Sequence, residues 1–379
     1  MKVTKPLTLL GGISPTEFMQ RYWQRKPLLV RQAIPAFSPL LTRGELFDLA
    51  CQDGVESRLV MGENAGQRDW QLQSGPFKKR DFPKLAEPDW TLLVQGVDLH
   101  NERVAALMQQ FRFVPDARLD DVMISYASDG GGVGPHFDSY DVFLLQAHGE
   151  RRWRIGRQKD LSLREDLPLK ILEHFEPEHD WVLQPGDMLY LPPRYAHDGV
   201  AMGECMTYSI GFRVPQSGDL ARELLVRLSD DAEEAVGHAL YRDAEQAAVS
   251  QPGAIPSAMH DFAQAAVQRA LKDPLALPRA LGEFMTEPKA NVWFEGGVVP
   301  RKLLSVRLDR RSRMMYDRHH VFLNGESWRA AGVDARLMRR LADQRCLDVS
   351  DLAQASPQAL KLLRAWCEDG WLHSPAGLP

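Results

Sequence analysis

The stretch Gly134-Pro135-His136-Phe137-Asp138 decides how the rest of this chain is interpreted. Far downstream lies a second stretch, Leu191-Pro192-Pro193-Arg194-Tyr195-Ala196-His197. A His-x-Asp pair and a distant His form the 2-His-1-carboxylate facial triad, which holds Fe(II) on one face and leaves the opposite positions open for oxygen and a co-substrate. We therefore predict that His136, Asp138 and His197 are metal ligands and that the protein is an oxygenase.

The segments around these residues predict how the ligands come together. Residues 120–126 read as a strand, and the glycine-rich turn 129–134 follows them. Alternate residues of a strand face the same side, so we expect His136 and Asp138 to project together from a strand. Because proline fixes its own backbone angle, the corner at Pro192-Pro193 is expected to deliver the third ligand rigidly.

The other histidines lack such a setting. His148 lies in the segment 146–150, which has the composition of a hairpin turn. Seven more lie in polar or helical surroundings, and we expect them at the surface: His174, His179, His238, His260, His319, His320 and His373.

Together with several flanking segments, these motifs resemble the Jumonji-C branch of the 2-oxoglutarate-dependent oxygenases, in particular the bacterial ribosomal-protein arginine hydroxylases. The resemblance is strong for residues 15–215 and looser beyond. It implies Fe(II), 2-oxoglutarate as co-substrate and O2, and hydroxylation of the β-carbon of an arginine in a protein of the large (50S) ribosomal subunit. The segments that carry it are 18–27, Ser125-Tyr126, 130–138, 140–143, 151–154, 185–187, His197 and 208–213.

The resemblance also implies where 2-oxoglutarate binds. Arg151 would hold the far carboxylate of the co-substrate, a task suited to the planar fork of a guanidinium, and Ser125 would donate its hydroxyl to the same carboxylate. Strand alternation places Arg151 and Trp153 on one face, and Arg152 and Arg154 on the other. The alternatives are a solvent-exposed strand face for the arginine and an ordinary core position for the serine.

A second group of residues is predicted to bind the substrate. Asp121 and Met123 alternate with Ser125, so all three share one face of their strand. A carboxylate beside an aromatic wall suits a guanidinium and its alkyl stem. We therefore predict that substrate is bound by Asp121, Met123, Tyr140 and Ser209. One departure from the family is Glu150, which stands where the related hydroxylases often carry a basic residue and could change how substrate approaches.

Composition favours an ordinary cytoplasmic protein of two to three domains. The chain has 379 residues, of which 44% are hydrophobic and 26% charged. It has no apolar run of the ~20 residues that a membrane span needs, and no secretory signal. The four cysteines are scattered and indicate neither a zinc site nor disulfides. A net charge of −5 argues against a general nucleic-acid binder.

We divide the chain into three regions. Residues 1–215 are predicted to form a mainly β oxygenase domain, a cupin-like double-stranded β-helix or jelly roll. Residues 216–279 are expected to be helical, with breaks at Pro274 and Pro278, and the resemblance favours their use in a homodimer. Residues 280–379 resemble a winged-helix-like α+β module. Its basic run (Arg307, Arg310, Arg311 and Arg313) is better explained as a solvated hairpin, so no direct nucleic-acid binding is expected.

Other functions remain open at this stage. Hydroxylation of a histidine in a ribosomal protein is the first alternative, and lysine demethylation is a more distant one. A non-catalytic cupin-like metal-binding protein is the alternative from another class. Arg151 argues against that last possibility, because a simple metal-binding barrel does not need a buried cation beside the triad.

Overall fold

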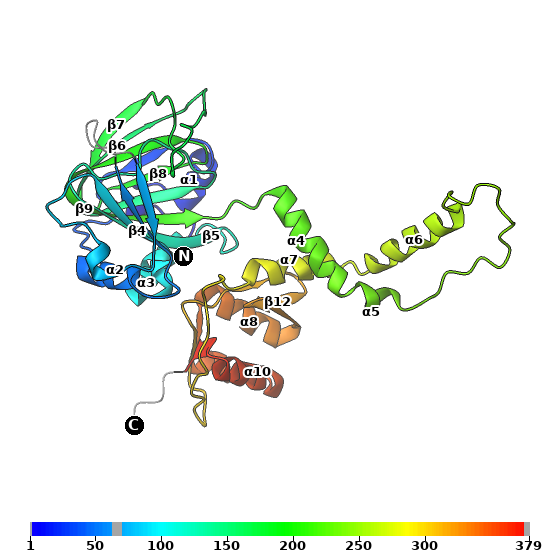
Figure 1. Cartoon of the computed structure of the whole chain (residues 1–379). Coiled ribbons are helices and arrows are strands. Elements are labelled where there is room, and N and C mark those ends of the chain that lie inside the picture. The colour runs from blue at the N-terminus through cyan, green and yellow to red at the C-terminus, as the bar shows by residue number, and fades with distance from the viewer. Residues whose placement is uncertain (1, 63–69, 375–379) are drawn as a thin grey trace. The chain divides into compact units, whose positions relative to one another are not determined.

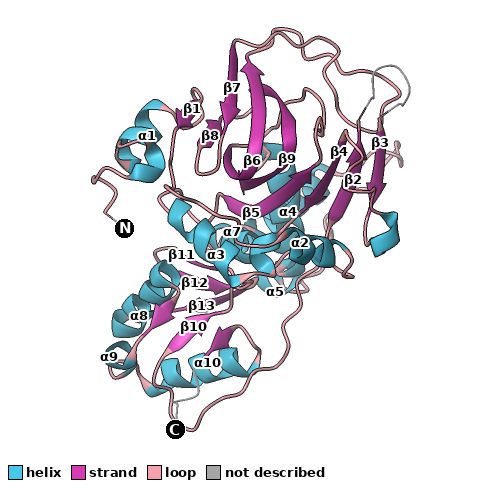
Figure 2. Cartoon of the chain, turned by 90° about the vertical axis from the view of Figure 1, so that its left-hand side faces the viewer, coloured by secondary structure: helices cyan, strands magenta, loops and turns pink. Residues whose placement is uncertain are grey.

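The computed structural model describes residues 2–62 and 70–374, and the chain divides into two compact units, 1–214 and 215–379. The first unit is built on one nine-stranded sheet (Figures 1 and 2). Along its main path the strand order is β1-β8-β6-β9-β5-β4-β2-β3, and β7 pairs with β6 off that path. The strands are β1 Leu28–Val30, β2 Ser57–Met61, β3 Gln71–Ser74, β4 Trp90–Val94, β5 Leu119–Ala127, β6 Val142–Gly156, β7 His179–Leu183, β8 Met188–Leu191 and β9 Ala196–Phe212.

Two long antiparallel strands, β6 and β9, give the sheet its jelly-roll form. The first half of β6 pairs with β8, and its second half pairs with β7. Strands β6 and β9 pair with each other along their whole lengths, and β5 pairs with the second half of β9. Because their outer neighbours change midway, the sheet folds over a cavity, and the main apolar core lies between its other face and the helices. The predicted mainly β, jelly-roll fold is confirmed.

The prediction of a hairpin turn around His148 is wrong. Strand β6 runs without a break from Val142 to Gly156, and its register with β9 shifts on both sides of His148. Gly149 in this segment has φ +59, a left-handed conformation that favours glycine. The glycine therefore marks a bulge within one strand and not a turn between two strands.

Short helices cover the outer face of the sheet. They are α1 Pro15–Arg21, α2 Arg43–Ala50 and α3 Glu102–Met108, with 3-10 turns at Thr8–Leu10, Lys79–Asp81, Val97–Leu99 and Gln109–Phe111. Helix α2 begins with a capping box, in which Thr42 and Glu45 satisfy each other's backbone N–H groups. From α1, the fully buried Phe18 packs edge-on against Tyr190 of β8 at a ring separation of 4.9 Å.

A buried carboxylate ties the N-terminal segment to the loop that carries the predicted ligands. Asp141 is fully buried, and the Tyr190 hydroxyl donates to it at 2.6 Å. The Gln24 side-chain amide donates to it at 3.1 Å and Arg118 at 3.2 Å. Burial nevertheless raises the pKa of Asp141 above its ordinary value. These partners fix the chain directly after Asp138 and Tyr140.

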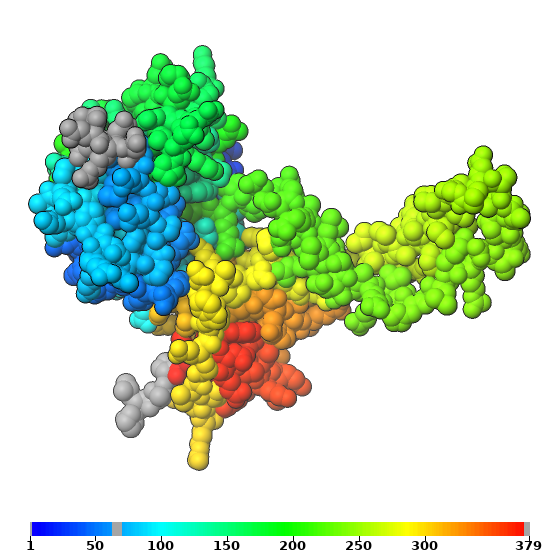
Figure 3. All heavy atoms as spheres, viewed as in Figure 1, coloured from blue at the N-terminus to red at the C-terminus, as the bar shows by residue number. Residues whose placement is uncertain are grey.

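The second unit begins with a helical segment that carries exposed apolar residues and is coloured green to yellow-green in Figure 3. Helices α4 Ser217–Asp230, α5 Ala232–Val236 and α6 Ser257–Ala270 contain no buried residue among those described. Helix α7 Ala276–Thr286 contacts both α4 and β12. The break predicted at Pro278 is wrong, because this proline lies in the first turn of α7, where a backbone N–H has no helical partner to lose.

The rest of the second unit is an α+β module. Strands β10 Val306–Leu308, β14 Cys346–Leu347 and β15 Leu372–His373 form one sheet, and β11 Met314–Tyr316, β12 His320–Leu323 and β13 Glu326–Arg329 form another. Helices α8 Gly332–Gln344, α9 Val349–Leu352 and α10 Pro357–Glu368 complete it.

Arg311 of the basic run is paired with Asp309. The surface position predicted for His320 is wrong, since this residue is buried and bonds to Asp317. No helix in the described ranges is long and apolar enough to cross a membrane.

The Asp141 network gives a first prediction. Replacing Tyr190 with Phe removes the hydroxyl that donates to Asp141 and accepts from the Gln24 backbone N–H at 2.7 Å. We expect the free energy of unfolding of the full chain to fall by about 1–3 kcal/mol, the cost of leaving buried polar groups without partners. Urea denaturation followed by circular dichroism measures it. Tyr22→Phe is the control, and an equal loss in both variants would contradict the assignment.

Candidate active site

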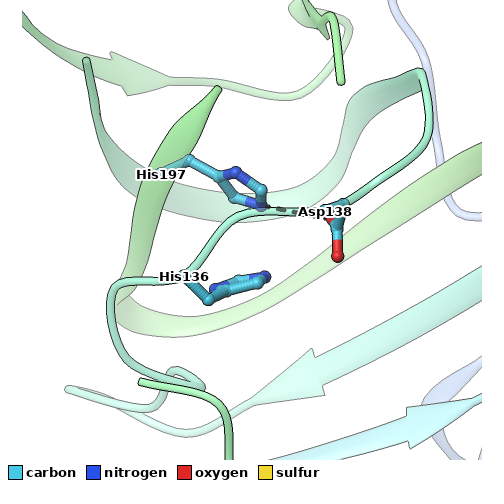
Figure 4. A group of neighbouring side chains, drawn as sticks. All are labelled: His136, Asp138 and His197. Carbon is cyan, nitrogen blue, oxygen red and sulfur yellow. Dashed lines mark ion pairs between the residues drawn. The ribbon is translucent and has the colours of Figure 1, made fainter. Parts of the chain in front are cut away.

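The side chains of the three predicted ligands lie close together (Figure 4). One potential ligand atom from each of His136, Asp138 and His197 lies within 4.8 Å of the others. The distance from His197 Nε2 to Asp138 Oδ2 is 3.7 Å. This is the only group of three or more such side chains found in the described residues.

The backbone around the ligands differs from the predicted strand. His136 forms only an isolated bridge with His197, and Asp138 lies in a loop. The two histidine backbones bond reciprocally, with N···O distances of 3.0 and 2.8 Å. The Arg194 N–H donates to the Asp138 carbonyl, and Tyr195 N–H donates to Pro192, which forms the predicted corner before His197. These bonds, and not strand alternation, hold the three side chains together.

Both imidazoles are oriented for metal binding. His136 Nδ1 lies 2.9 Å from the Gly134 carbonyl oxygen, and His197 Nδ1 lies 3.0 Å from that of Tyr195. A carbonyl oxygen can only accept a hydrogen bond, so each Nδ1 carries the proton and each Nε2 keeps its lone pair. Burial, reinforced by the neighbouring His136, lowers the pKa of His197 to about 4. The neutral form, which a metal ligand requires, is therefore favoured.

The ligands open into a cavity of about 510 Å³ inside the first unit. Its wall includes every residue predicted from the sequence to bind metal, co-substrate or substrate: Ser125, Arg151, Asp121, Met123, Tyr140, Ser209 and the three ligands. Glu150 does not line this cavity; it is held at the surface by a hydrogen bond from Gln184. The sequence-based selection of residues therefore describes one continuous site.

Arg151 lies in this cavity, as predicted. Its side chain donates to Ser125 Oγ at 3.1 Å and to the Gly199 carbonyl at 3.1 Å, and it is almost fully buried. Burial lowers the pKa of Arg151, but a guanidinium remains charged in proteins. In the described ranges no carboxylate forms an ion pair with it. Arg152 and Arg154 instead face outward and pair with Asp180 and Asp198.

The space for this guanidinium depends on a glycine. A Cβ atom on Gly199 would lie 2.9 Å from Arg151 Nε and 2.6 Å from the ring of Trp153. The Trp153 ring lies under the guanidinium, with 5.1 Å from Arg151 Cζ to its centre, and 5.9 Å from the ring of His197. Cation–π contact of this kind orients an arginine without neutralising it.

The predicted substrate residues line the same cavity. Asp121 is buried, and its Oδ2 accepts hydrogen bonds from Gln95 Nε2 at 2.8 Å and from the Gly96 N–H at 3.0 Å. The sequence analysis did not select Gln95, Arg58 or Lys170, which also line the cavity. They come from a loop, a strand and another loop without any local motif, so only the folded structure reveals them.

Comparison with known proteins places this site in a family. Residues 106–220 match the family model of the JmjC domain, and residues 269–373 match that of the ROXA-like winged helix. Ribosomal protein uL16 3-hydroxylase of Escherichia coli (strain K12) is 42% identical over 207 residues, an alignment that covers 54% of each chain. The alignments thus span about half the length of the curated relatives.

Solved structures extend the similarity to nearly the whole chain. YcfD, described as a ribosomal oxygenase from Escherichia coli, superposes with a TM-score of 0.79 at 30% identity, covering 98% of this chain and 99% of that one. A structure of YcfD in complex with cobalt and 2-oxoglutarate gives a TM-score of 0.77 at 31% identity, covering 94% of this chain and 97% of that one. The fold and site define a JmjC-domain protein with a C-terminal winged helix. This chain belongs to the ribosomal oxygenase family.

The geometry of the three ligands leads to a prediction about metal affinity. Replacing Asp138 with Ala should raise the Kd for cobalt(II) by more than about 100-fold, because changes to outer-shell partners alone cost roughly 10–100-fold. Calorimetry on the purified protein measures this affinity without turnover. Asp120→Asn, which changes another carboxylate of the cavity wall, is the control. Unchanged cobalt binding in Asp138→Ala would show that the metal binds elsewhere.

Proposed function

We propose that this protein is an Fe(II)- and 2-oxoglutarate-dependent hydroxylase that modifies a ribosomal protein. The observation that carries the proposal is the buried Arg151, which has no carboxylate partner in the described residues and shares a cavity with the triad. A charge in this position is costly unless an anion neutralises it. A dicarboxylate that reaches from the metal to Arg151 would do so.

The side chains present fit Fe(II). Two neutral imidazole nitrogens and one carboxylate are the donors of the facial triad, and the cavity beyond them leaves room for further ligands. When bound, Fe(II) with 2-oxoglutarate and O2 supplies the oxidising chemistry, in which 2-oxoglutarate becomes succinate and CO2 and one oxygen atom becomes a hydroxyl group on the substrate.

The chain itself supplies orientation and a closed environment. Arg151 and Ser125 would hold the far carboxylate of 2-oxoglutarate, and the guanidinium can grip it bidentately. The ring of Trp153 and the apolar Val142 and Leu144 line the same cavity and limit access of water. The co-substrate would thus have one position relative to the metal ligands.

The proposed target is the β-carbon of an arginine in a large-subunit ribosomal protein. The Escherichia coli relative is named as a 3-hydroxylase of ribosomal protein uL16. In this chain, Asp121 would receive the guanidinium, with Met123, Tyr140 and Ser209 around the side-chain stem. Gln95 and Gly96 hold one carboxylate oxygen of Asp121, which fixes the direction of the carboxylate. A neutral imidazole would gain less from this charge than a guanidinium does.

Location and assembly form part of the same proposal. A ribosomal substrate places the protein in the cytoplasm. Helices α4 and α6 would pair with a second copy of the chain, because their exposed apolar residues need a partner. These are Leu225, Val226, Met259 and Val267.

The C-terminal winged helix would not bind nucleic acid directly, since Arg364 of α10 is engaged with the carbonyls of Pro300 and Arg301.

The role of Arg151 can be tested through the co-substrate. Arg151→Ala should raise the KM for 2-oxoglutarate by at least about 30-fold, because an unpaired buried partner charge costs about 2–5 kcal/mol. The KM for the protein substrate should change much less. Arg152→Ala, which removes an exposed arginine paired with Asp180, is the matched control. Should Arg152→Ala raise the KM for 2-oxoglutarate while Arg151→Ala leaves it unchanged, the site assignment fails.

The substrate class can be tested in cells and with purified enzyme. Peptide mass spectrometry of ribosomal proteins should show an arginine heavier by one oxygen atom, and this modification should vanish when the gene is deleted. Asp121→Asn should raise the KM for the target peptide on the order of 10- to 100-fold, the scale of a charge-assisted hydrogen bond. Turnover of 2-oxoglutarate without peptide should persist.

The outcomes separate the competing functions. Modification of a histidine would agree with the proposed oxygenase activity but would refute arginine as the target residue. Absence of 2-oxoglutarate turnover in the iron-loaded protein would support a metal-binding barrel without catalysis.

A further inference from the structure

We infer that Gln146 is a positioning residue that holds a β-bulge, and that this bulge turns Arg151 into the cavity. The inference rests on the proposed role of Arg151 toward 2-oxoglutarate. Gln146 is fully buried on β6, five residues before Arg151, and it does not line the cavity itself. No part of the proposed chemistry uses its side chain.

The inward-facing positions of β6 change from even to odd along the strand. Val142 and Leu144 line the cavity at the start of β6, whereas Arg151 and Trp153 line it at the end. Alternate residues of a regular strand keep to one face, so an unbroken alternation from Val142 could not place Arg151 inside. The buried cluster of Val142, Leu144, Trp153 and Ile155 shows the same change.

The pairing with β9 locates the change. Leu144 pairs with Ser209 and Gln146 with Thr207, whereas beyond the shifts Arg151 pairs with Ala201. The register shifts twice between Gln146 and Glu150. If the first register continued, Ala201 would face Arg152 and Gly199 would face Arg154. The inward face would then carry Arg152 and Arg154, and Arg151 would point to the outside.

The side chain of Gln146 closes this bulge. Its Nε2 donates to the carbonyls of His148 at 2.8 Å and Gly149 at 3.2 Å, and its Oε1 accepts from the Thr207 hydroxyl at 2.9 Å. A bulge disrupts the ladder, and unpaired carbonyls are costly in the interior. One amide therefore satisfies the carbonyls that the bulge takes out of the ladder.

Gly149 supports the same geometry from the backbone. Its φ of +59 is a conformation that side chains disfavour, and a Cβ atom there would lie 2.1 Å from the Glu204 carbonyl oxygen. Gln146 and Gly149 thus stabilise the bulge independently, and neither of them lines the cavity. A change at either residue should therefore act on the co-substrate mainly through the direction of Arg151.

The test is a mutant cycle read by binding. Calorimetry with 2-oxoglutarate on the cobalt(II)-loaded full chain would compare wild type, Gln146→Met, Gly149→Ala, Arg151→Ala and the double variant Gln146→Met/Arg151→Ala. We expect Gln146→Met to raise the Kd for 2-oxoglutarate by on the order of 10- to 100-fold, as for misplacement of a binding group by ~1 Å. Cobalt affinity should stay unchanged. Gly149→Ala should give the same result and serves if Gln146→Met does not fold.

The double variant distinguishes positioning from general damage. If Gln146 acts through Arg151, the double variant binds 2-oxoglutarate no more weakly than Arg151→Ala does. Additive losses, or wild-type affinity in both Gln146→Met and Gly149→Ala, would overturn the inference. If Arg151→Ala itself binds 2-oxoglutarate normally, the proposed function of Arg151 fails instead.

Discussion

A buried guanidinium that forms no ion pair with a carboxylate among residues 2–62 and 70–374 is the constraint around which this site is built. Arg151 is held by a serine hydroxyl and a backbone carbonyl, both neutral acceptors. Those partners orient the charge but leave it uncompensated, which costs stability until an anion enters the cavity. Gly199 provides the space, Trp153 provides the surface under the guanidinium, and the bulge in β6 provides the direction. The proposed affinity for a dicarboxylate is based on this arrangement.

The three predicted metal ligands are also held in place, mainly by backbone hydrogen bonds. Reciprocal bonds between His136 and His197 set the distance between two chain segments that are remote in sequence, and carbonyl acceptors select the tautomer of each ring. Asp138 is held from both sides, by the Arg194 N–H and by the buried network of Asp141. A site whose ligands are oriented before metal arrives loses less entropy on binding and keeps one geometry through the reaction.

Sequence patterns predicted the chemistry of the site better than its backbone. The ligand set follows from residue types and their spacing, and the family resemblance implies the place of Arg151 in the cavity, whereas a bulge and not strand alternation turns Arg151 inward. The continuity of β6 could not be predicted from the sequence. His148-Gly149 has the composition of a turn, and only its pairing with β9 makes it a bulge. Burial of His320 depends on Asp317 and on tertiary packing, and Gln95 reaches Asp121 across elements distant in sequence. Such long-range contacts leave no periodic signal in the chain.

A crystal structure of this chain with cobalt(II) and 2-oxoglutarate tests the account most directly, since anomalous scattering locates the metal independently of the protein atoms. We predict cobalt on Nε2 of His136 and His197 and on the Asp138 carboxylate, with the far carboxylate of 2-oxoglutarate on Arg151 and Ser125. Cobalt bound outside these three side chains would contradict the account. A far carboxylate bound to Arg58 or Lys170, with Arg151 left without an anion, would contradict it equally.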